Sequence, residues 1–139
     1  MINSIVTGIS KKLYELFGAE YEIYSETVEQ NLQEPCFLIR NIKTQYNQII
    51  GKRFYFNSRF DIIYFSDKEN KNNDMQNICY ELLDGLEYIE LVNGDLIHGT
   101  KMESETIDDV LHFRVNYNLI LKKENDIIDT MQDIQINTK

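Results

Sequence analysis

The stretch RFYFNSRFDIIYF, residues 53–65, decides the fold of this chain. Its side chains alternate along the backbone, with Phe54, Phe56, Phe60, Ile62 and Tyr64 on one face and Tyr55, Asn57, Arg59 and Asp61 on the other. Alternation with a period of two predicts a long antiparallel β-strand. Because aromatic residues occupy both faces, both need cover, which helices can supply on one side and a subunit contact on the other.

Two amphipathic helices flank this strand in the sequence. Apolar residues recur at helical spacing near the N-terminus and again after residue 73, which predicts helices over residues 3–17 and 73–86. The first pattern is followed by Gly18, a residue typical of helix ends. The apolar positions are Ile2, Ile5, Val6, Ile9, Leu13, Leu16 and Phe17, and then Met75, Ile78, Cys79, Leu82, Leu83 and Leu86.

The remaining segments predict further strands. Residues 21–24 form a short strand, the polar segment 25–34 a loop, and Pro35 opens a strand over residues 36–42. Residues 86–92 and 95–105 flank Asn93-Gly94, a pair that favours a type I′ hairpin turn. A second turn at residues 106–109 leads into the apolar strand 110–123. This order predicts an α+β fold, in which an antiparallel sheet carries the two main helices on one face.

The length of 139 residues predicts a single domain over residues 1–123, followed by a tail. A domain of this size does not need a disulfide bond for stability. In the tail, residues 124–139, Ile127, Ile128, Met131 and Ile134 recur at near-helical spacing in an acidic background. Two interpretations stay open for this tail: a flexible end, or a short helix that docks on the domain or on a neighbour.

Composition argues against two large classes of function. No apolar run approaches the roughly 18–20 residues of a membrane span, so we expect a soluble, unprocessed, cytosolic protein without a membrane partner. The 23 acidic and 14 basic residues give a formal net charge of -9. That balance is opposite to what phosphate neutralisation requires, so we expect no specific nucleic-acid binding.

Catalytic and metal chemistry find little support in the sequence. If the last two strands pair about a turn at residues 106–109, His98 faces a residue near 117 and His112 one near 103. The two histidines then lie about 17 Å apart and cannot share a metal. Cys36 and Cys79 belong to no CxxC motif and are expected as buried thiols. Phosphate-binding and nucleophile motifs are missing from the sequence. We therefore expect no enzyme, cofactor or metal.

Charge is segregated along the chain. Residues 20–34 contain five glutamates and no base, namely Glu20, Glu22, Glu26, Glu29 and Glu34. Residues 35–60 contain five bases and no acid, namely Arg40, Lys43, Lys52, Arg53 and Arg59. Either the two segments screen each other within one chain, or one meets the other on a neighbouring subunit. The second arrangement is a head-to-tail interface that is able to close into a ring.

Four blocks, distributed over almost the whole chain up to residue 123, carry a family resemblance. They are MINSIVTGISKKLYELFG, YEIYSETVEQNLQEPCFLIRNI, FYFNSRFDIIYF and GDLIHGTKMESETIDDVLHFRVNYN. In their order and spacing they resemble the phage tail terminator family of phages and prophage-derived particles of low-GC Gram-positive bacteria. No single block is a catalytic-type motif.

The resemblance implies a structural protein that forms a homohexameric ring on the last ring of the tail tube. Such a ring ends tube polymerisation and offers a new surface to the neck or collar. In a contractile, headless particle of the R-type bacteriocin kind, it would close the tube and hold the top of the sheath. DNA of a phage would pass the lumen without specific binding. The protein would be made in the bacterial cytoplasm and end in the virion tail or tail-like particle.

Within this resemblance, the acidic residues Glu103, Glu105, Asp108 and Asp109 of the last hairpin are expected to face the lumen or the tube. Two competing functions stay open. One is a different neck component, such as a head–tail connector, which would bind a portal-side ring. The other, of a different class, is an acidic DNA mimic that inhibits a host protein; it would be a monomer or dimer with strongly salt-sensitive binding.

Overall fold

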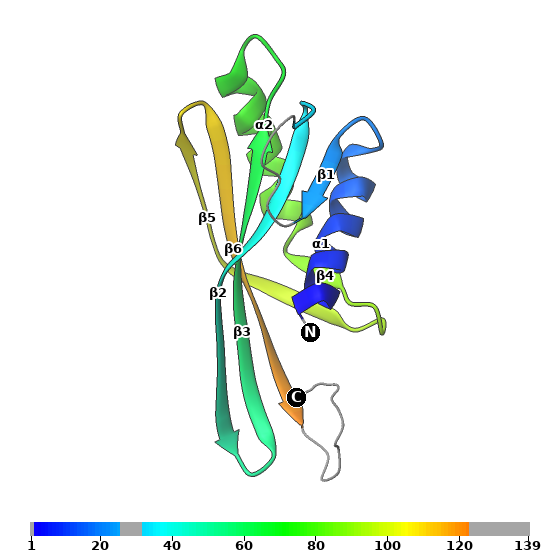
Figure 1. Cartoon of the computed structure of the whole chain (residues 1–139), viewed down its shortest axis with the longest axis vertical. Coiled ribbons are helices and arrows are strands. Elements are labelled where there is room, and N and C mark those ends of the chain that lie inside the picture. The colour runs from blue at the N-terminus through cyan, green and yellow to red at the C-terminus, as the bar shows by residue number, and fades with distance from the viewer. Residues whose placement is uncertain (1, 26–31, 123–139) are drawn as a thin grey trace. The chain divides into compact units, whose positions relative to one another are not determined.

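A computed structural model describes residues 2–25 and 32–122 of the chain. Two helices and six strands make up these residues, which confirms the α+β prediction (Figure 1). The expectations for Glu26, Glu29 and the tail 124–139 lie outside the described residues. The elements follow one another as α1 (Ile2–Phe17), β1 (Glu22–Ser25), β2 (Cys36–Ile50), β3 (Arg53–Phe65), α2 (Lys71–Gly85), β4 (Tyr88–Glu90), β5 (Leu96–Ile107) and β6 (Val110–Lys122).

The strands form one sheet in the order β1-β2-β3-β6-β5-β4. The sheet is mixed, and in this it differs from the wholly antiparallel sheet that the sequence predicts. β1 pairs parallel to β2, with Glu22 opposite Cys36 and Ser25 opposite Ile39. Ten residues separate these two strands, so the chain has the length to return and run in the same direction, which a tight hairpin cannot do.

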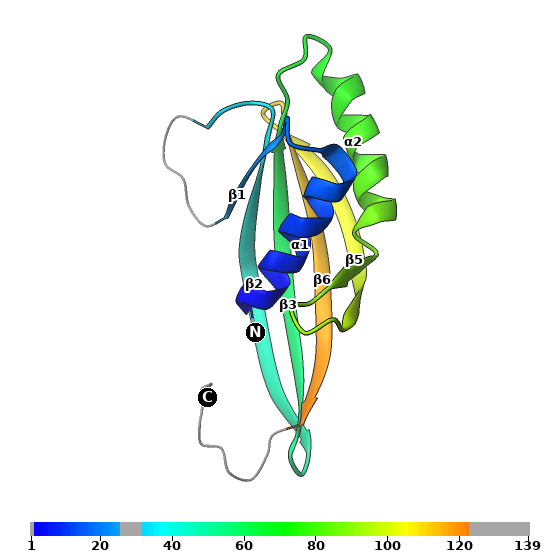
Figure 2. The same cartoon turned by 90° about the vertical axis from the view of Figure 1, so that its right-hand side faces the viewer.

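Two compact units divide the chain: Met1–Thr44 with Asn57–Asn118, and Gln45–Phe56 with Leu119–Lys139. In the first unit, α1 buries Ile5, Ile9 and Leu13 completely and contacts β1, β4 and α2. Figure 2 shows both helices in front of the strands. Among the residues that the structure describes, no helix is both long enough and apolar enough to cross a membrane.

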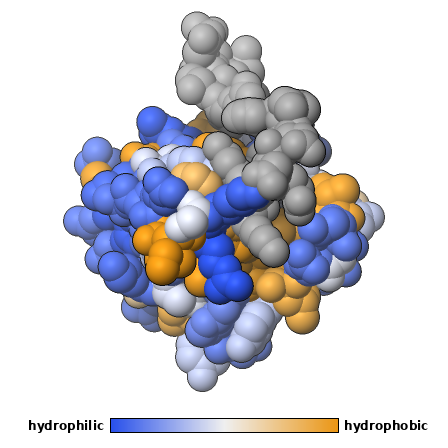
Figure 3. Space-filling view, turned by 90° about the horizontal axis from the view of Figure 1, so that it is seen from below, coloured by the Kyte–Doolittle hydropathy of each residue, from blue (hydrophilic) through white to orange (hydrophobic). Residues whose placement is uncertain are grey.

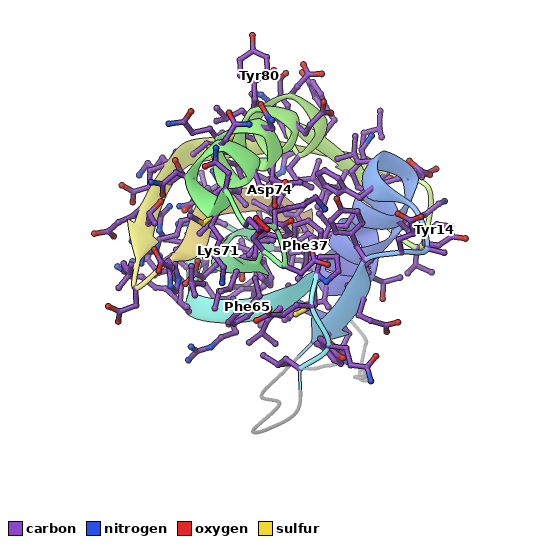
Figure 4. The ribbon with its side chains drawn as sticks, turned by 90° about the horizontal axis from the view of Figure 1, so that it is seen from above. Tyr14, Phe37, Phe65, Lys71, Asp74 and Tyr80 are labelled. Atoms are coloured by element: carbon purple, nitrogen blue, oxygen red, sulfur yellow. The ribbon has the colours of Figure 1, made fainter. Side chains whose placement is uncertain are left out.

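An aromatic cluster joins α1 to the sheet in the first unit. Phe17 at the end of α1 packs on Phe37 of β2 with ring centroids 5.0 Å apart, and Phe37 packs on Tyr64 of β3 at the same distance. Figure 4 shows Phe37 inside this unit, whereas Tyr14 and Tyr80 point outward from α1 and α2. The pattern of residues 53–65 is therefore confirmed, because Phe60 and Tyr64 are fully buried.

Helix α2 is fixed to the same cluster by polar contacts. Asn70 caps its N-terminus by accepting a hydrogen bond from the Asn73 amide. Asp74, in the first turn, accepts hydrogen bonds of 2.6 Å from the hydroxyls of both Tyr64 and Ser66. Burial of the Tyr64 hydroxyl and its hydrogen bond to Asp74 raise the pKa of Tyr64, so the phenol stays protonated and donates.

The two hairpin turns differ from each other in backbone conformation. Asp108 and Asp109 alone connect β5 to β6, with φ of 52° and 62°, as a type I′ turn requires. At the β4–β5 turn only Gly94 has positive φ, and its amide donates to the Leu91 carbonyl. That turn is a three-residue loop with its left-handed residue at Gly94, so the type I′ prediction for Asn93-Gly94 was wrong.

Strand pairing corrects the predicted neighbour of His112. Because the turn holds Asp108 and Asp109 and not all of residues 106–109, His112 lies opposite Glu105 and not a residue near 103. Farther along, a β-bulge at Lys101 and Met102 shifts the register between Thr100 and Glu103. Lys101 has a φ of 51°, a left-handed conformation that fits a bulge.

β2 extends eight residues beyond the predicted end at Ile42. All of its residues from Arg40 to Ile50 are exposed, so no burial pattern marks this part of the strand in the sequence. In the second unit, Tyr46 and Phe54 stack with centroids 5.2 Å apart and planes within 2° of parallel. Gly51, with φ of 56°, opens the two-residue turn to β3.

Candidate functional site

The sheet face formed by β3, β6 and β5 carries a network of charged side chains. Arg59 of β3 donates hydrogen bonds to Asn116 of β6 and to the carboxylate of Glu103 on β5. The same guanidinium reaches the Lys101 carbonyl at the bulge, at 3.2 Å. In a regular strand the Lys101 carbonyl would accept a backbone hydrogen bond from a neighbouring strand. At the bulge it accepts one from Arg59 instead. Arg59 connects three strands through one side chain.

A second set of charges lies beside the first. The carboxylate of Asp61 on β3 lies 2.9 Å from the imidazole Nδ1 of His112, and 3.9 Å from Nε of Arg114. Arg114 also contacts Glu105 at 3.1 Å. The Asp61 side chain is only 8% exposed, and its Oδ1 accepts no hydrogen bond. Arg114 and His112 both lie against this buried carboxylate, an arrangement that suits a fixed structural element of the sheet.

Sequence reasoning placed Asp61 and His112 on strands without linking them. Their contact depends on the register between β3 and β6, which no local pattern specifies. The second histidine, His98, is more exposed and stacks on Tyr88, its partner in the β4–β5 pair, while Nε2 lies 3.4 Å from a Glu87 carboxylate oxygen. Neither histidine joins a set of three potential metal ligands among the described residues.

The four acidic residues predicted for the β5–β6 hairpin are all exposed and divide into two pairs. Glu103 and Glu105 form ion pairs with Arg59 and Arg114 of their own sheet. Asp108 and Asp109 occupy the two central positions of the turn. Among the described residues, the negative charge of the hairpin that no ion pair compensates therefore lies at the turn, on Asp108 and Asp109. Replacing these two residues with neutral ones is expected to leave the ion pairs of the sheet intact, whereas replacing Glu103 and Glu105 would break them.

The structure separates the predicted basic residues in a similar way. Arg59 is bound within the chain, where it forms an ion pair with Glu103. Arg40, Lys43, Lys52 and Arg53 are exposed, as are Glu20, Glu22 and Glu34 of the acidic set. Within residues 2–25 and 32–122, no ion pair links Glu20, Glu22 or Glu34 to Arg40, Lys43 or Arg53. Arg40 lies beside an open groove between α1 and β2, a feature that the sequence does not reveal.

The two cysteines occupy different environments. Cys36 is fully buried, and burial together with the carboxylates of Glu34 and Glu22 raises the pKa of its thiol to about 11. Cys79 is only partly buried, with Sγ 3.2 Å from the Ser104 hydroxyl. The expectation of buried thiols is therefore correct for Cys36 and only partly so for Cys79.

A family model described as phage tail terminator protein matches residues 4–129. The chain belongs to this family. The match includes α1 from Ser4 onward, α2 and the six strands of the described residues, so the sheet network and the acidic turn are parts of a tail terminator fold. Phage tail terminators are structural proteins of the virion tail, a kind of protein that is not enzymatic. No curated protein matches the sequence.

Proposed function

We propose that this phage tail terminator forms a homohexameric ring that caps the tail tube, ends its polymerisation and connects to the neck or sheath top. The observation that carries the proposal is the family match over residues 4–129. The subunit, the tube protein and the neck, collar or sheath proteins are its partners. The ring assembles in the bacterial cytoplasm and remains in the particle.

The exposed charges support ring closure. The acidic residues Glu20, Glu22 and Glu34 and the basic residues Lys43 and Arg53 are exposed in one subunit. A head-to-tail contact brings the acidic set of one subunit to the basic set of the next, and the same contact repeats around the ring. Orange apolar patches among hydrophilic surface in Figure 3 supply further area for such contacts.

Weak contacts suffice for capping because the ring binds as a unit. If each subunit contributes about 2 kcal/mol, six contribute about 12 kcal/mol, which corresponds to a nanomolar dissociation constant before ordering costs. The acidic turn of Asp108 and Asp109 is proposed to face the lumen or the tube. Negative charge in the lumen repels DNA phosphates, so DNA passes without specific binding.

The deciding experiment is negative-stain electron microscopy of purified tube protein assembled with and without this protein, with mass photometry to count subunits. Rings of six at one end of length-limited tubes are the expected result. Bare ends and unchanged lengths would reject capping. Binding to a portal-side ring would then favour a head–tail connector, and salt-sensitive binding of a basic host protein by a monomer or dimer would favour a DNA mimic.

Charge reversal tests the proposed subunit contact. Lys43→Glu with Arg53→Glu is expected to abolish ring assembly, and Glu20→Lys with Glu22→Lys is expected to restore it in part. Arg59→Glu is the matched control, because Arg59 is bound to Glu103 and Asn116 in its own chain. Its reversal should lower the stability of the subunit, with no rescue from Glu20 or Glu22. Failure of every compensating pair would exclude this contact.

The acidic turn is tested by Asp108→Asn with Asp109→Asn. Asparagine removes both charges and tolerates positive φ, so the turn is preserved. Impaired tube-length control with an unchanged melting temperature is the expected result. Glu103→Gln with Glu105→Gln is the comparison, because it removes charges already paired with Arg59 and Arg114. Normal particles from the Asp108 and Asp109 variant would remove the turn from the interface.

A further inference from the structure

We propose that a groove at the start of α1 receives residues 123–139 of a second copy of this chain. This inference deepens the proposed ring and rests on it. The groove is a cavity of about 360 Å³ between α1, the end of β1 and β2. A cavity of this size holds a few side chains of a longer segment that lies across it.

The lining of the groove combines apolar and cationic groups. Ile2 and Val6 of α1 and Ile39 of β2 supply its apolar part, and Asn3, Arg40 and Asn41 supply most of its polar part. The Asn41 amide already donates to the Ser58 hydroxyl at 2.7 Å. Arg40 is exposed, and no carboxylate of the described residues forms an ion pair with it. The groove therefore favours a segment with apolar side chains and a carboxylate.

Local charge strengthens this preference. The first turn of α1 contains no acidic residue, so nothing there neutralises the partial positive charge of the helix N-terminus. The described acidic residues nearest in sequence to the groove's β2 side, Glu22 and Glu34, form no ion pair with Arg40. An incoming carboxylate would pair with Arg40 in a partly apolar setting, where ion pairs are screened less than on open surface.

The C-terminal sequence matches these requirements. Residues 124–136, ENDIIDTMQDIQI, contain four carboxylates and no base. They carry Ile127, Ile128, Met131 and Ile134 at near-helical spacing. A segment of this composition offers an apolar stripe to Ile2, Val6 and Ile39 and a carboxylate to Arg40. The protein has 14 basic and 23 acidic residues, so an acidic segment meets fewer bases than acids on its surface. Pairing with Arg40 therefore makes the groove a selective site for the segment.

A second groove provides the contrast. It lies between α2 and β5, has a volume of about 270 Å³, and is lined by Met75, Cys79, Leu83 and Leu111 among other uncharged residues. An acidic segment in that groove would desolvate carboxylates without a cation in the lining. The occupant of the first groove is assigned to a second copy because a contact from one subunit to the next repeats around a ring, whereas a contact within one chain links no subunits.

Site-directed disulfide formation tests the contact in the full-length chain. One variant carries Val6→Cys and the other Ile128→Cys, both with Cys79→Ser, so that buried Cys36 is the remaining native thiol. Val6 is only partly buried, so the small cysteine side chain should be accommodated. Oxidation of a mixture of the two variants is expected to give a covalent dimer on a non-reducing gel. Each variant alone should give far less.

Two controls make the result specific. Leu83→Cys in the second groove replaces Val6→Cys and should give no dimer with Ile128→Cys. Arg40→Glu, added to the Val6→Cys chain, should lower the dimer yield several-fold, and circular dichroism should show that the fold persists. A chain that carries both Val6→Cys and Ile128→Cys is the second control. If it forms the disulfide within one chain and stays a monomer, the assignment to a second copy is overturned. If neither Ile128→Cys nor Met131→Cys forms a disulfide with Val6→Cys, docking of the segment in the groove is overturned.

The outcome is independent of capping. Hexamers that cap tubes without any Val6–Ile128 cross-link would reject this inference and leave the proposed function standing. A cross-linked dimer together with bare tube ends would establish the groove contact and reject the capping function. Both readouts come from the same preparations, by gel and by negative-stain microscopy.

Discussion

The carboxylate of Asp61 and the imidazole of His112 meet across β3 and β6, with Oδ2 2.9 Å from Nδ1. Their side chains are 8% and 19% exposed. Arg114 lies on the other side of the same carboxylate. This contact, like the bonds of Arg59 to Asn116 and Glu103, fixes the register of the central strands and so holds the polar face of the sheet in one arrangement.

Replacing Asp61 by alanine is expected to destabilise the subunit by about 2–3 kcal/mol, since it leaves His112 and Arg114 without their shared partner. Chemical denaturation of the purified variant measures this change. Asp67→Ala is the control, because Asp67 forms an exposed ion pair with Lys68 and should change stability by less than about 1 kcal/mol. Equal effects of the two substitutions would contradict a structural role for Asp61.

The β5–β6 turn predicts an order of stabilities at Asp108. Asp108→Ala is expected to cost about 1–2 kcal/mol, because alanine resists the left-handed conformation at φ of 52°. Asp108→Asn should be neutral, and Asp108→Asn with Asp109→Gly should raise the melting temperature, since Asn-Gly is preferred in type I′ turns. A melting temperature for Asp108→Ala equal to that of the unmodified protein would rule out the type I′ turn.

Gly8 in α1 faces the backbone of β4 at close range. A β-carbon built at Gly8 would lie 2.7 Å from the Glu90 carbonyl oxygen, a distance that forces α1 and β4 apart. Although alanine favours helices, Gly8→Ala is expected to destabilise the protein by about 1–3 kcal/mol. Thr7→Ala, on the exposed side of the same helix, should leave stability unchanged or slightly raised. Thermal melts followed by circular dichroism compare the two.

The thiol of Cys36 should resist alkylation. With its pKa raised to about 11, roughly one molecule in a thousand carries a thiolate at pH 8. Mass spectrometry after iodoacetamide treatment should find Cys79 modified before Cys36, and unfolding in guanidinium should remove the difference. Rapid labelling of Cys36 in the native protein would show that strand β2 is open at this position.

The same pKa sets a pH dependence of stability. Because the folded pKa of Cys36 lies above the ordinary thiol value of 9.0, the native state favours the neutral thiol. Its contribution is fully present below about pH 9 and is lost as the pH rises toward 11. Cys36→Ser should flatten the decline of stability between these values, as measured by urea denaturation at a series of pH values. An unchanged slope would exclude Cys36 as its origin.

Sequence periodicity by itself determined the helices and the central strand. Apolar spacing placed α1 and α2 within two residues of their ends, and the alternation from Phe54 to Tyr64 predicted β3, because each pattern reflects which face of an element is buried. The family resemblance rested likewise on order and spacing. The periodicity is local evidence, whereas the resemblance is distributed over almost the whole chain.

Tertiary structure decided what periodicity does not encode. Residues 43–50 of β2 are exposed, so no burial pattern marked them as strand. The register of β5 depends on the two-residue turn at Asp108 and on the bulge at Lys101, each of which shifts every later pairing. The contacts of Asp61 with His112 and of Arg59 with Glu103, and the groove beside Arg40, join residues far apart in the chain. They exist only because strand order and register bring these side chains together in space.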